Sequence, residues 1–92
     1  MVDGRTFDSK AEARRYLELK KLQASGVISG LRLQVRFPLS VNGVTVGKYV
    51  ADFVYIRDGR RVVEDVKGMR TAVYKLKCRL MLAVFGIEIL ET

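Results

Sequence analysis

The segment VVEDVKG, residues 62–68, places three ionisable side chains in an otherwise apolar strand pattern. Strand interiors normally avoid Glu, Asp and Lys, so Glu64, Asp65 and Lys67 need a reason to be there. Closely spaced carboxylates are the oxygen ligands that hard divalent cations prefer. This segment is therefore the first candidate for a site that does chemistry.

A predicted hairpin brings a further acid to this segment. Residues 48–57 and 60–67 both have strand-like patterns, and Asp58-Gly59 between them is a strong signal for a two-residue turn. Such a turn pairs the residues that flank it directly and fixes every opposed pair further along the two strands. The register then leads back to Asp52.

In this register Asp52 lies directly across from Asp65, with Cβ atoms expected roughly 4.5–5.5 Å apart on one face of the sheet. Lys67 points to the same face, where Val54 and Val63 form an apolar floor. Facing carboxylates repel each other, so the arrangement suits a positive charge between them. A divalent cation supplies that charge better than Lys67, and the pattern predicts a metal site held by oxygen ligands.

Structural alternatives stay open for the same residues. A bulge at the turn would pair Asp52 with Glu64. Glu64, instead of Asp65, would then share the sheet face of Asp52. Without a bulge, we expect Glu64 on the opposite face, near an edge or toward solvent. Asp52 could instead be held by backbone N–H groups, and Asp65 with Lys67 could form a structural ion pair.

A helix is predicted upstream of the strands, from about Phe7 to Ser25, with Gly26 as its stop. Ser9 and Glu12 have the spacing of a capping box. Glu12 also lies at the end of the core-facing stripe, so a capping role and a site role weigh equally. The stripe itself consists of Ala13, Tyr16, Leu19 and Leu22.

Residues 31–37 alternate between apolar and polar side chains, which predicts a half-buried strand with Leu31, Leu33, Val35 and Phe37 on one face. Pro38 is expected to end this strand, and Asn42-Gly43 to form a turn.

The remaining elements complete an α/β pattern. Residues 70–85 have helical spacing, Gly86 closes the helix, and residues 87–90 form a short last strand. The order α-β-β-β-α-β predicts a mixed four-stranded sheet flanked by helices, in a single domain over residues 1–92.

Composition favours a polyanionic partner. The net charge is +7, from 17 Lys and Arg against 10 acids, spread from Arg5 to Arg79 instead of gathered on one amphipathic helix. We therefore expect nucleic acid and no membrane, with a generic basic domain as the alternative. The absence of His and the single Cys78 exclude His general bases and structural zinc sites. A lone cysteine also fits a reducing cytoplasm.

The acid in the first helix, the Asp in a strand and the [D/E]-x-K of the next strand resemble the PD-(D/E)xK nuclease superfamily. The matching residues are Glu12, Asp52 and Asp65-Val66-Lys67, without a Pro before Asp52. From about Gly4 to Glu91 the chain resembles the DUF1064 phage and prophage family, regarded as Holliday-junction-resolvase-like or phage endonuclease-like. The segments are FDSKAEARRYLEL, LQVRFPL, ADFVY, VVEDVKG, T-x-x-Y-x-x-K at Thr71, Tyr74 and Lys77, and GIEI.

The resemblance implies a restriction-endonuclease-like core and a Mg²⁺- or Mn²⁺-dependent DNA endonuclease. Asp52 and Asp65 would ligate the metal together with the Val66 carbonyl, and Glu12 would hold a second metal or a nearby water. Lys67 would position or activate the attacking water. Nucleic-acid contacts are implied for Arg14, Gln34, Arg36, Arg70 and Lys77.

The substrate implied by the resemblance is branched or junction DNA, cut during recombination in a bacterial or phage-infected cytoplasm. Cutting a junction symmetrically would require a homodimer, because a chain of this size has one active site. One alternative is a nucleic-acid-binding module that has the fold but does not cleave. Another is an interaction protein whose carboxylates anchor the hairpin.

Overall fold

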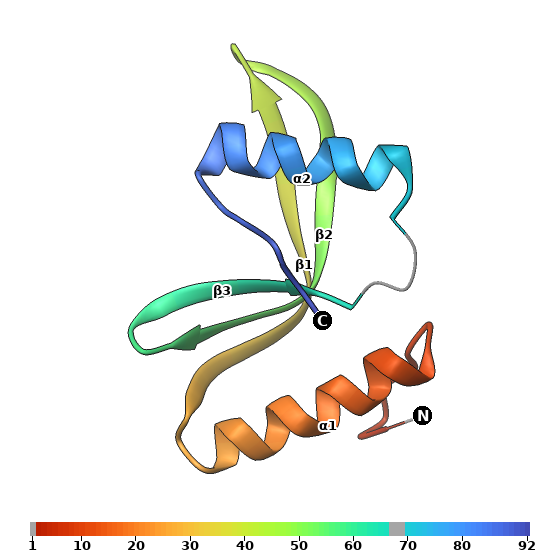
Figure 1. Ribbon diagram of the computed structural model, residues 1–92, viewed down its shortest axis with the longest axis vertical. Coiled ribbons are helices and arrows are strands. Elements are labelled where there is room, and N and C mark those ends of the chain that lie inside the picture. The colour runs from red at the N-terminus through yellow and green to blue at the C-terminus, as the bar shows by residue number, and fades with distance from the viewer. Residues whose placement is uncertain (1, 67–69) are drawn as a thin grey trace.

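A computed structural model describes residues 2–66 and 70–92 of the chain. In these parts two helices flank a sheet of four strands in the order β1-β2-β3-β4, with β1 to β3 antiparallel and β3 parallel to β4 (Figure 1). The predicted α/β order and mixed sheet are therefore confirmed. The elements are α1 (Lys10–Ala24), β1 (Ile28–Val41), β2 (Val44–Arg57), β3 (Arg60–Asp65), α2 (Ala72–Phe85) and β4 (Leu90–Glu91).

Capping side chains explain where both helices begin, and a glycine explains where α2 ends. The Ser9 hydroxyl accepts the Glu12 N–H at 3.1 Å and so caps α1, which confirms the Ser9 half of the predicted capping box. At α2, the Thr71 hydroxyl accepts the Tyr74 N–H at 3.1 Å. Gly86 closes α2 with φ 68°, a left-handed conformation that glycine adopts without steric cost.

Two apolar clusters lie on opposite faces of the sheet. The α1 cluster consists of Tyr16, Leu19, Ile28, Phe53 and Tyr55. The α2 cluster consists of Phe37, Leu39, Tyr49, Ala51, Val54, Val63, Tyr74 and Met81. Neither helix in the described ranges is long and apolar enough to cross a membrane.

The sequence predicted that Pro38 ends the first strand, but β1 continues to Val41. Pro38 pairs with Lys48. The sheet order makes β1 an edge strand, and an edge tolerates a residue that has no N–H to donate. The turn predicted at Asn42-Gly43 is present, with φ 51° and 78°.

The hairpin of β2 and β3 has the predicted register. Asp58 and Gly59 adopt φ 52° and 75°, the left-handed conformations of a two-residue hairpin turn. Arg57 pairs with Arg60, and the ladder runs without a bulge to Phe53 and Glu64. The next opposed positions are those of Asp52 and Asp65, so the alternative with a bulge is excluded.

The long strands β1 and β2 each change sides along their length, which corrects the prediction of one apolar face for residues 31–37. Leu31 and Leu33 pack against the α1 cluster, whereas Val35 packs against the α2 cluster. Gln34 lies between them with φ 52°, a conformation unusual for a side chain of this type. It reverses the alternation that a regular strand would maintain.

The same change of side occurs in β2 at Asp52. Ala51 belongs to the α2 cluster and Phe53 to the α1 cluster, although residues two apart normally share a face. Asp52 occupies the β2 position across from Gln34, because the pairs on either side share one register. In Figure 1 the two strands accordingly run from α2 at one end to α1 at the other.

Candidate functional site

Asp52 is held at the point where β2 changes sides. Its side chain is half-buried, and its Oδ2 accepts the backbone N–H of Val66 at 2.8 Å. This bond fixes the carboxylate beside the backbone that follows β3. This bond agrees in part with the alternative that backbone N–H groups hold Asp52, since one such group donates to its carboxylate.

Asp65 is almost fully buried, with 1% of its surface exposed. Its Oδ2 accepts a hydrogen bond of 2.5 Å from the Tyr49 hydroxyl. Burial, and then this carboxylate, raise the pKa of Tyr49 well above its ordinary value, so Tyr49 stays a donor at neutral pH. Val54 and Val63 belong to the α2 cluster as Tyr49 does, which confirms the predicted apolar floor.

A cleft of about 270 Å³ opens beside Asp65, between β2 and the start of α2. Two lysines, Lys48 of β2 and Lys77 of α2, line it together with Asp65. No acidic residue occupies the first turn of α2, so the partial positive charge of this helix end is not offset there. The cleft thus combines a carboxylate with positive charges that suit a phosphate group. The other lining residues are Tyr49, Val50, Thr71, Val73 and Tyr74.

Glu64, next to Asp65, faces α1 and is fully buried, whereas the prediction placed it near an edge or solvent. Its Oε2 accepts the Arg15 Nε–H at 2.8 Å and its Oε1 accepts the Nη2–H at 3.0 Å. The hydroxyls of Tyr55 and Thr92 donate to the same carboxylate at 2.7 and 3.1 Å. Four donated bonds from three residues explain how a charge can be buried here.

Glu12 is buried on α1, with 6% of its surface exposed. Among residues 2–66 and 70–92, no three Asp, Glu, Cys or His side chains converge into a group that could hold a metal ion. Glu12, Asp52 and Asp65 therefore do not form a three-acid cluster. The ligand set of Asp52, Asp65 and the Val66 carbonyl stays a prediction.

The predicted nucleic-acid-binding residues do not gather around the cleft. Lys77 lines it with Asp65, whereas Arg70 forms an ion pair with Glu91, Nη2 to Oε1 at 2.7 Å, in a separate pocket. Lys67 lies outside the described residues. Exposed side chains on α1, β1 and the segment before α2 belong to Arg14, Gln34, Arg36 and Arg70.

Three residues of these surroundings were missed from the sequence. Regular alternation assigns Tyr49 and Asp52 to opposite faces, so only the change of side in β2 brings Tyr49 to Asp65. Nothing in the strand pattern of residues 48–57 marked Lys48 as a site residue. Arg15 could have been found, because it is one helical turn from Glu12 and a buried Glu64 requires a cation.

In the comparison with known families, the family model described as "Protein of unknown function (DUF1064)" matches residues 1–87. No curated protein and no solved structure matches the chain.

Proposed function

This chain belongs to the DUF1064 family, and we propose that it is a metal-dependent DNA endonuclease. The observation that supports the proposal is the ladder of β2 and β3, which ends at Phe53 and Glu64, one position before Asp52 and Asp65. Asp52 accepts the N–H of Val66, next to Asp65, and Asp65 lines a cleft with Lys48 and Lys77. Carboxylates that face each other across two strands suit a hard cation. The lysines and the net charge of +7 suit a DNA backbone.

The residues present fit Mg²⁺ or Mn²⁺. Every proposed ligand is an oxygen: the carboxylates of Asp52 and Asp65 and the carbonyl of Val66. The Val66 N–H and the Tyr49 hydroxyl each orient one carboxylate, as partners of metal ligands commonly do. A second metal or a bound water next to Glu12 stays part of the proposal.

In the proposed mechanism, each group of the chain has one task. The bound ion would lower the pKa of a water and offset the charge that grows on the phosphate. Asp52 and Asp65 would hold that ion, and Tyr49 would keep Asp65 oriented. Lys67 would position the attacking water, and Lys48 and Lys77 would hold the phosphate in the cleft.

The proposed substrate is branched or junction DNA, with a homodimer as the cutting unit and the cytoplasm as the setting. Support comes from the resemblance in sequence and from exposed basic side chains that can contact a DNA backbone with little sequence reading, namely Arg14, Arg36 and Arg70.

The test is a cleavage panel of labelled junction, flap, duplex and single-stranded DNA with Mg²⁺, Mn²⁺ or EDTA. We expect cleavage with either ion and none with EDTA. Asp65→Asn should lower the rate by ~10²–10³-fold, because metal stabilisation of the reacting phosphate amounts to several kcal/mol. Asp58→Asn is the matched control, since Asn suits the left-handed turn position.

A second candidate function is a nucleic-acid-binding module that does not cleave. The lack of a three-acid group among the described residues favours it. Binding to DNA without cutting under every divalent ion would decide for this module and against the nuclease.

A further inference from the structure

Where β3 ends, strands β1 and β2 continue as a two-stranded ribbon, residues 36–50, whose tip is the segment 41–46. In Figure 1 the tip projects past α2 at one end of the molecule. The valines of the tip are uncovered, since Val41 is 42% exposed, Val44 is 62% exposed and Val46 is 55% exposed. The tip is therefore an apolar surface that the core of the fold does not use.

The ribbon carries positive charges and no negative charge. No acidic residue occurs between Glu18 and Asp52 in the sequence. Arg36 and Lys48 lie on the same face of the ribbon, because the strand pairs that contain them are two positions apart. A surface with this charge is complementary to a polyanion such as DNA.

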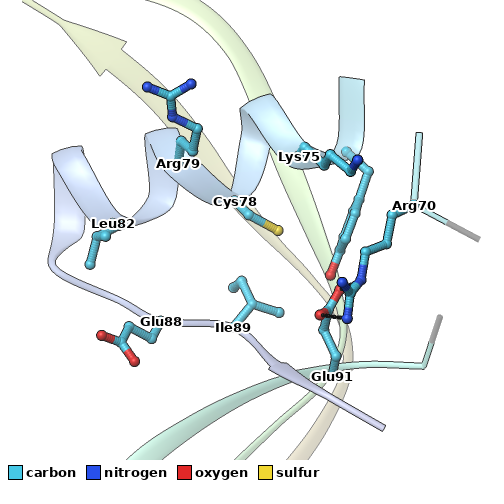
Figure 2. Close-up of a pocket in the computed structure, with 9 residues that line it drawn as sticks. Arg70, Lys75, Cys78, Arg79, Leu82, Glu88, Ile89 and Glu91 are labelled. Carbon is cyan, nitrogen blue, oxygen red and sulfur yellow. Dashed lines mark hydrogen bonds and ion pairs between the residues drawn. The ribbon is translucent and has the colours of Figure 1, made fainter. Parts of the chain in front are cut away.

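The hollow beside α2 differs from the ribbon in its charge. Figure 2 shows this hollow, of about 410 Å³, with Glu88 and Glu91 among the residues that line it. Three cations line it as well, but one of them, Arg70, is already paired with Glu91. The ribbon holds only cations, so DNA bound in the cleft beside Asp65 is attracted more strongly along the ribbon than over this hollow.

The ribbon is long enough to reach the base edges of a DNA duplex. Lys48 lines the cleft beside Asp65, where the proposed function places a phosphate. Val44 lies four residues before Lys48 in β2, which corresponds to roughly 13 Å at the rise of an antiparallel strand. The major groove of DNA is about 8.5 Å deep, so a ribbon that contacts a phosphate through Lys48 can reach the floor of the groove with its tip.

The shape and the side chains of the tip suit the major groove of a duplex. This groove is about 12 Å wide and admits a two-stranded ribbon, whereas the minor groove is only about 6 Å wide. In the major groove thymine presents its C5-methyl group, which apolar side chains can contact. Single strands are commonly bound by aromatic side chains that stack on the bases, and residues 41–46 contain no aromatic residue.

A strand of another protein fits the ribbon less well than DNA does. Among the described residues, β3 pairs with β2 only as far as Phe53, which leaves the edge of β2 from Val44 to Asp52 open. However, the register of β1 and β2 shifts between Leu39 and Ser40. Such an irregularity twists the edge of a sheet away from regular pairing with a further strand.

We propose that the tip of the ribbon enters the major groove of the duplex next to the phosphate held in the cleft, where Val44 and Val46 contact thymine methyl groups. Arg36 and Lys48 would contact the phosphates at the rim of the same groove. The inference rests on the proposed DNA partner but not on cleavage, so it holds equally for a module that binds DNA without cutting it.

Duplexes with deoxyuridine in place of thymidine test the contact, because the exchange removes only the C5-methyl groups. Fluorescence anisotropy measures binding of both duplexes to the chain with EDTA and, for the slow variant Asp65→Asn, with Mg²⁺. We expect the uracil duplex to bind about 4–15-fold more weakly, at about fourfold for each methyl group contacted. Equal affinity for the two duplexes under both conditions overturns the proposal.

The double change Val44→Ser and Val46→Ser should abolish the preference for thymine. Both valines are more than half exposed, so the variant is expected to fold, as circular dichroism would verify. It should bind the thymine duplex as weakly as the uracil duplex. The matched control is Val27→Ser, at a residue 43% exposed after the end of α1, which should keep the preference of the unchanged chain. A double variant that still prefers thymine would refute the groove contact.

The outcomes distinguish this inference from the proposed function. A chain that cuts DNA but binds the thymine and uracil duplexes equally keeps the nuclease and loses the groove contact. A chain that binds neither duplex, with or without Mg²⁺, overturns both. If the double change weakens binding of single-stranded DNA as much as binding of the duplex, the tip contacts single strands and the groove contact is wrong.

Discussion

Glu64 and Asp65 are neighbours in the chain with almost no exposed surface, yet their surroundings differ. Glu64 faces α1 and receives bonds from Arg15, Tyr55 and Thr92. Asp65 faces the other side, where Tyr49 donates to it and a cleft with two lysines opens. One carboxylate is enclosed by its partners, and the other lies at the wall of a space that a ligand can enter.

Burial alone therefore does not distinguish a functional acid from a structural one. The bidentate Arg15–Glu64 pair ties α1 to β3, and such a pair is costly to break because it leaves a charge buried without its counterpart. Asp65, in contrast, lines a cleft, where the proposed cation would bind. Substitutions that make the same chemical change at Glu64 and at Asp65 test this difference.

The largest expected effect follows from Glu64→Gln, which removes the charge but keeps the shape. We expect it to lower the free energy of unfolding by about 3–5 kcal/mol, because Arg15 loses its buried partner. Asp65→Asn, measured without metal, should change it by less than ~1 kcal/mol, since the amide oxygen still accepts the Tyr49 hydroxyl. Chemical denaturation measures both, and equal losses would contradict the division of roles.

Tyr49→Phe tests whether orientation of Asp65 matters for metal binding. Loss of a hydrogen-bond partner behind a metal ligand commonly weakens affinity by about 10–100-fold, and we expect such a loss for Mn²⁺ in calorimetric titration. Tyr16→Phe is the matched control: the buried Tyr16 hydroxyl donates to Asp3 at 2.9 Å on the other face. Similar weakening in both variants would indicate a general effect on stability.

High pH should affect the α1 side through Tyr55. Burial, and then the hydrogen bond to Glu64, raise the pKa of Tyr55 to about 12. A pKa raised in the folded state contributes stability below the unfolded value near 10, and that contribution is lost as pH rises from there to about 12. In Tyr55→Phe the free energy of unfolding should therefore fall less over this pH range, by on the order of 1–2 kcal/mol. Unfolding titrations at several alkaline pH values check this, and parallel curves would rule it out.

The smallest expected effect concerns Lys48 in the cleft. Lys48→Ala should weaken binding to any DNA duplex a few-fold and reduce the salt slope by about 1, as for one phosphate contact. Lys20→Ala, an exposed lysine on α1, should leave the slope unchanged. Fluorescence anisotropy over a range of salt concentrations measures the slopes, and identical slopes for both variants would remove Lys48 from the proposed interface.

The hairpin and the caps could be predicted because their signals are local. Asp58-Gly59 alone fixes the register that brings Asp52 to Asp65, and Ser9 alone marks the start of α1. The course of β1 past Pro38 could not be predicted, since it depends on β1 being an edge strand.

The surroundings of the two acids were less predictable. Alternation assumes a regular strand, and the left-handed conformation of Gln34 breaks that assumption without any glycine to announce it. Tyr49 reaches Asp65 only because β2 changes sides as well. The burial of Glu64 depends on Arg15, a residue far away in the chain.

The two hairpin turns of the sheet have different roles. One sets the alignment of β2 with β3, and the other closes the end of the β1–β2 ribbon. The Asp58-Gly59 turn alone sets how Asp52 meets Asp65, while the turn at Asn42-Gly43 lies at the far end of the β1–β2 ribbon. Related chains could therefore lengthen or shorten the ribbon by matched pairs of residues around Asn42-Gly43, where insertions are best tolerated, and leave the pairing of β2 with β3 unchanged. The ribbon tip is thus the part of this molecule most free to diverge.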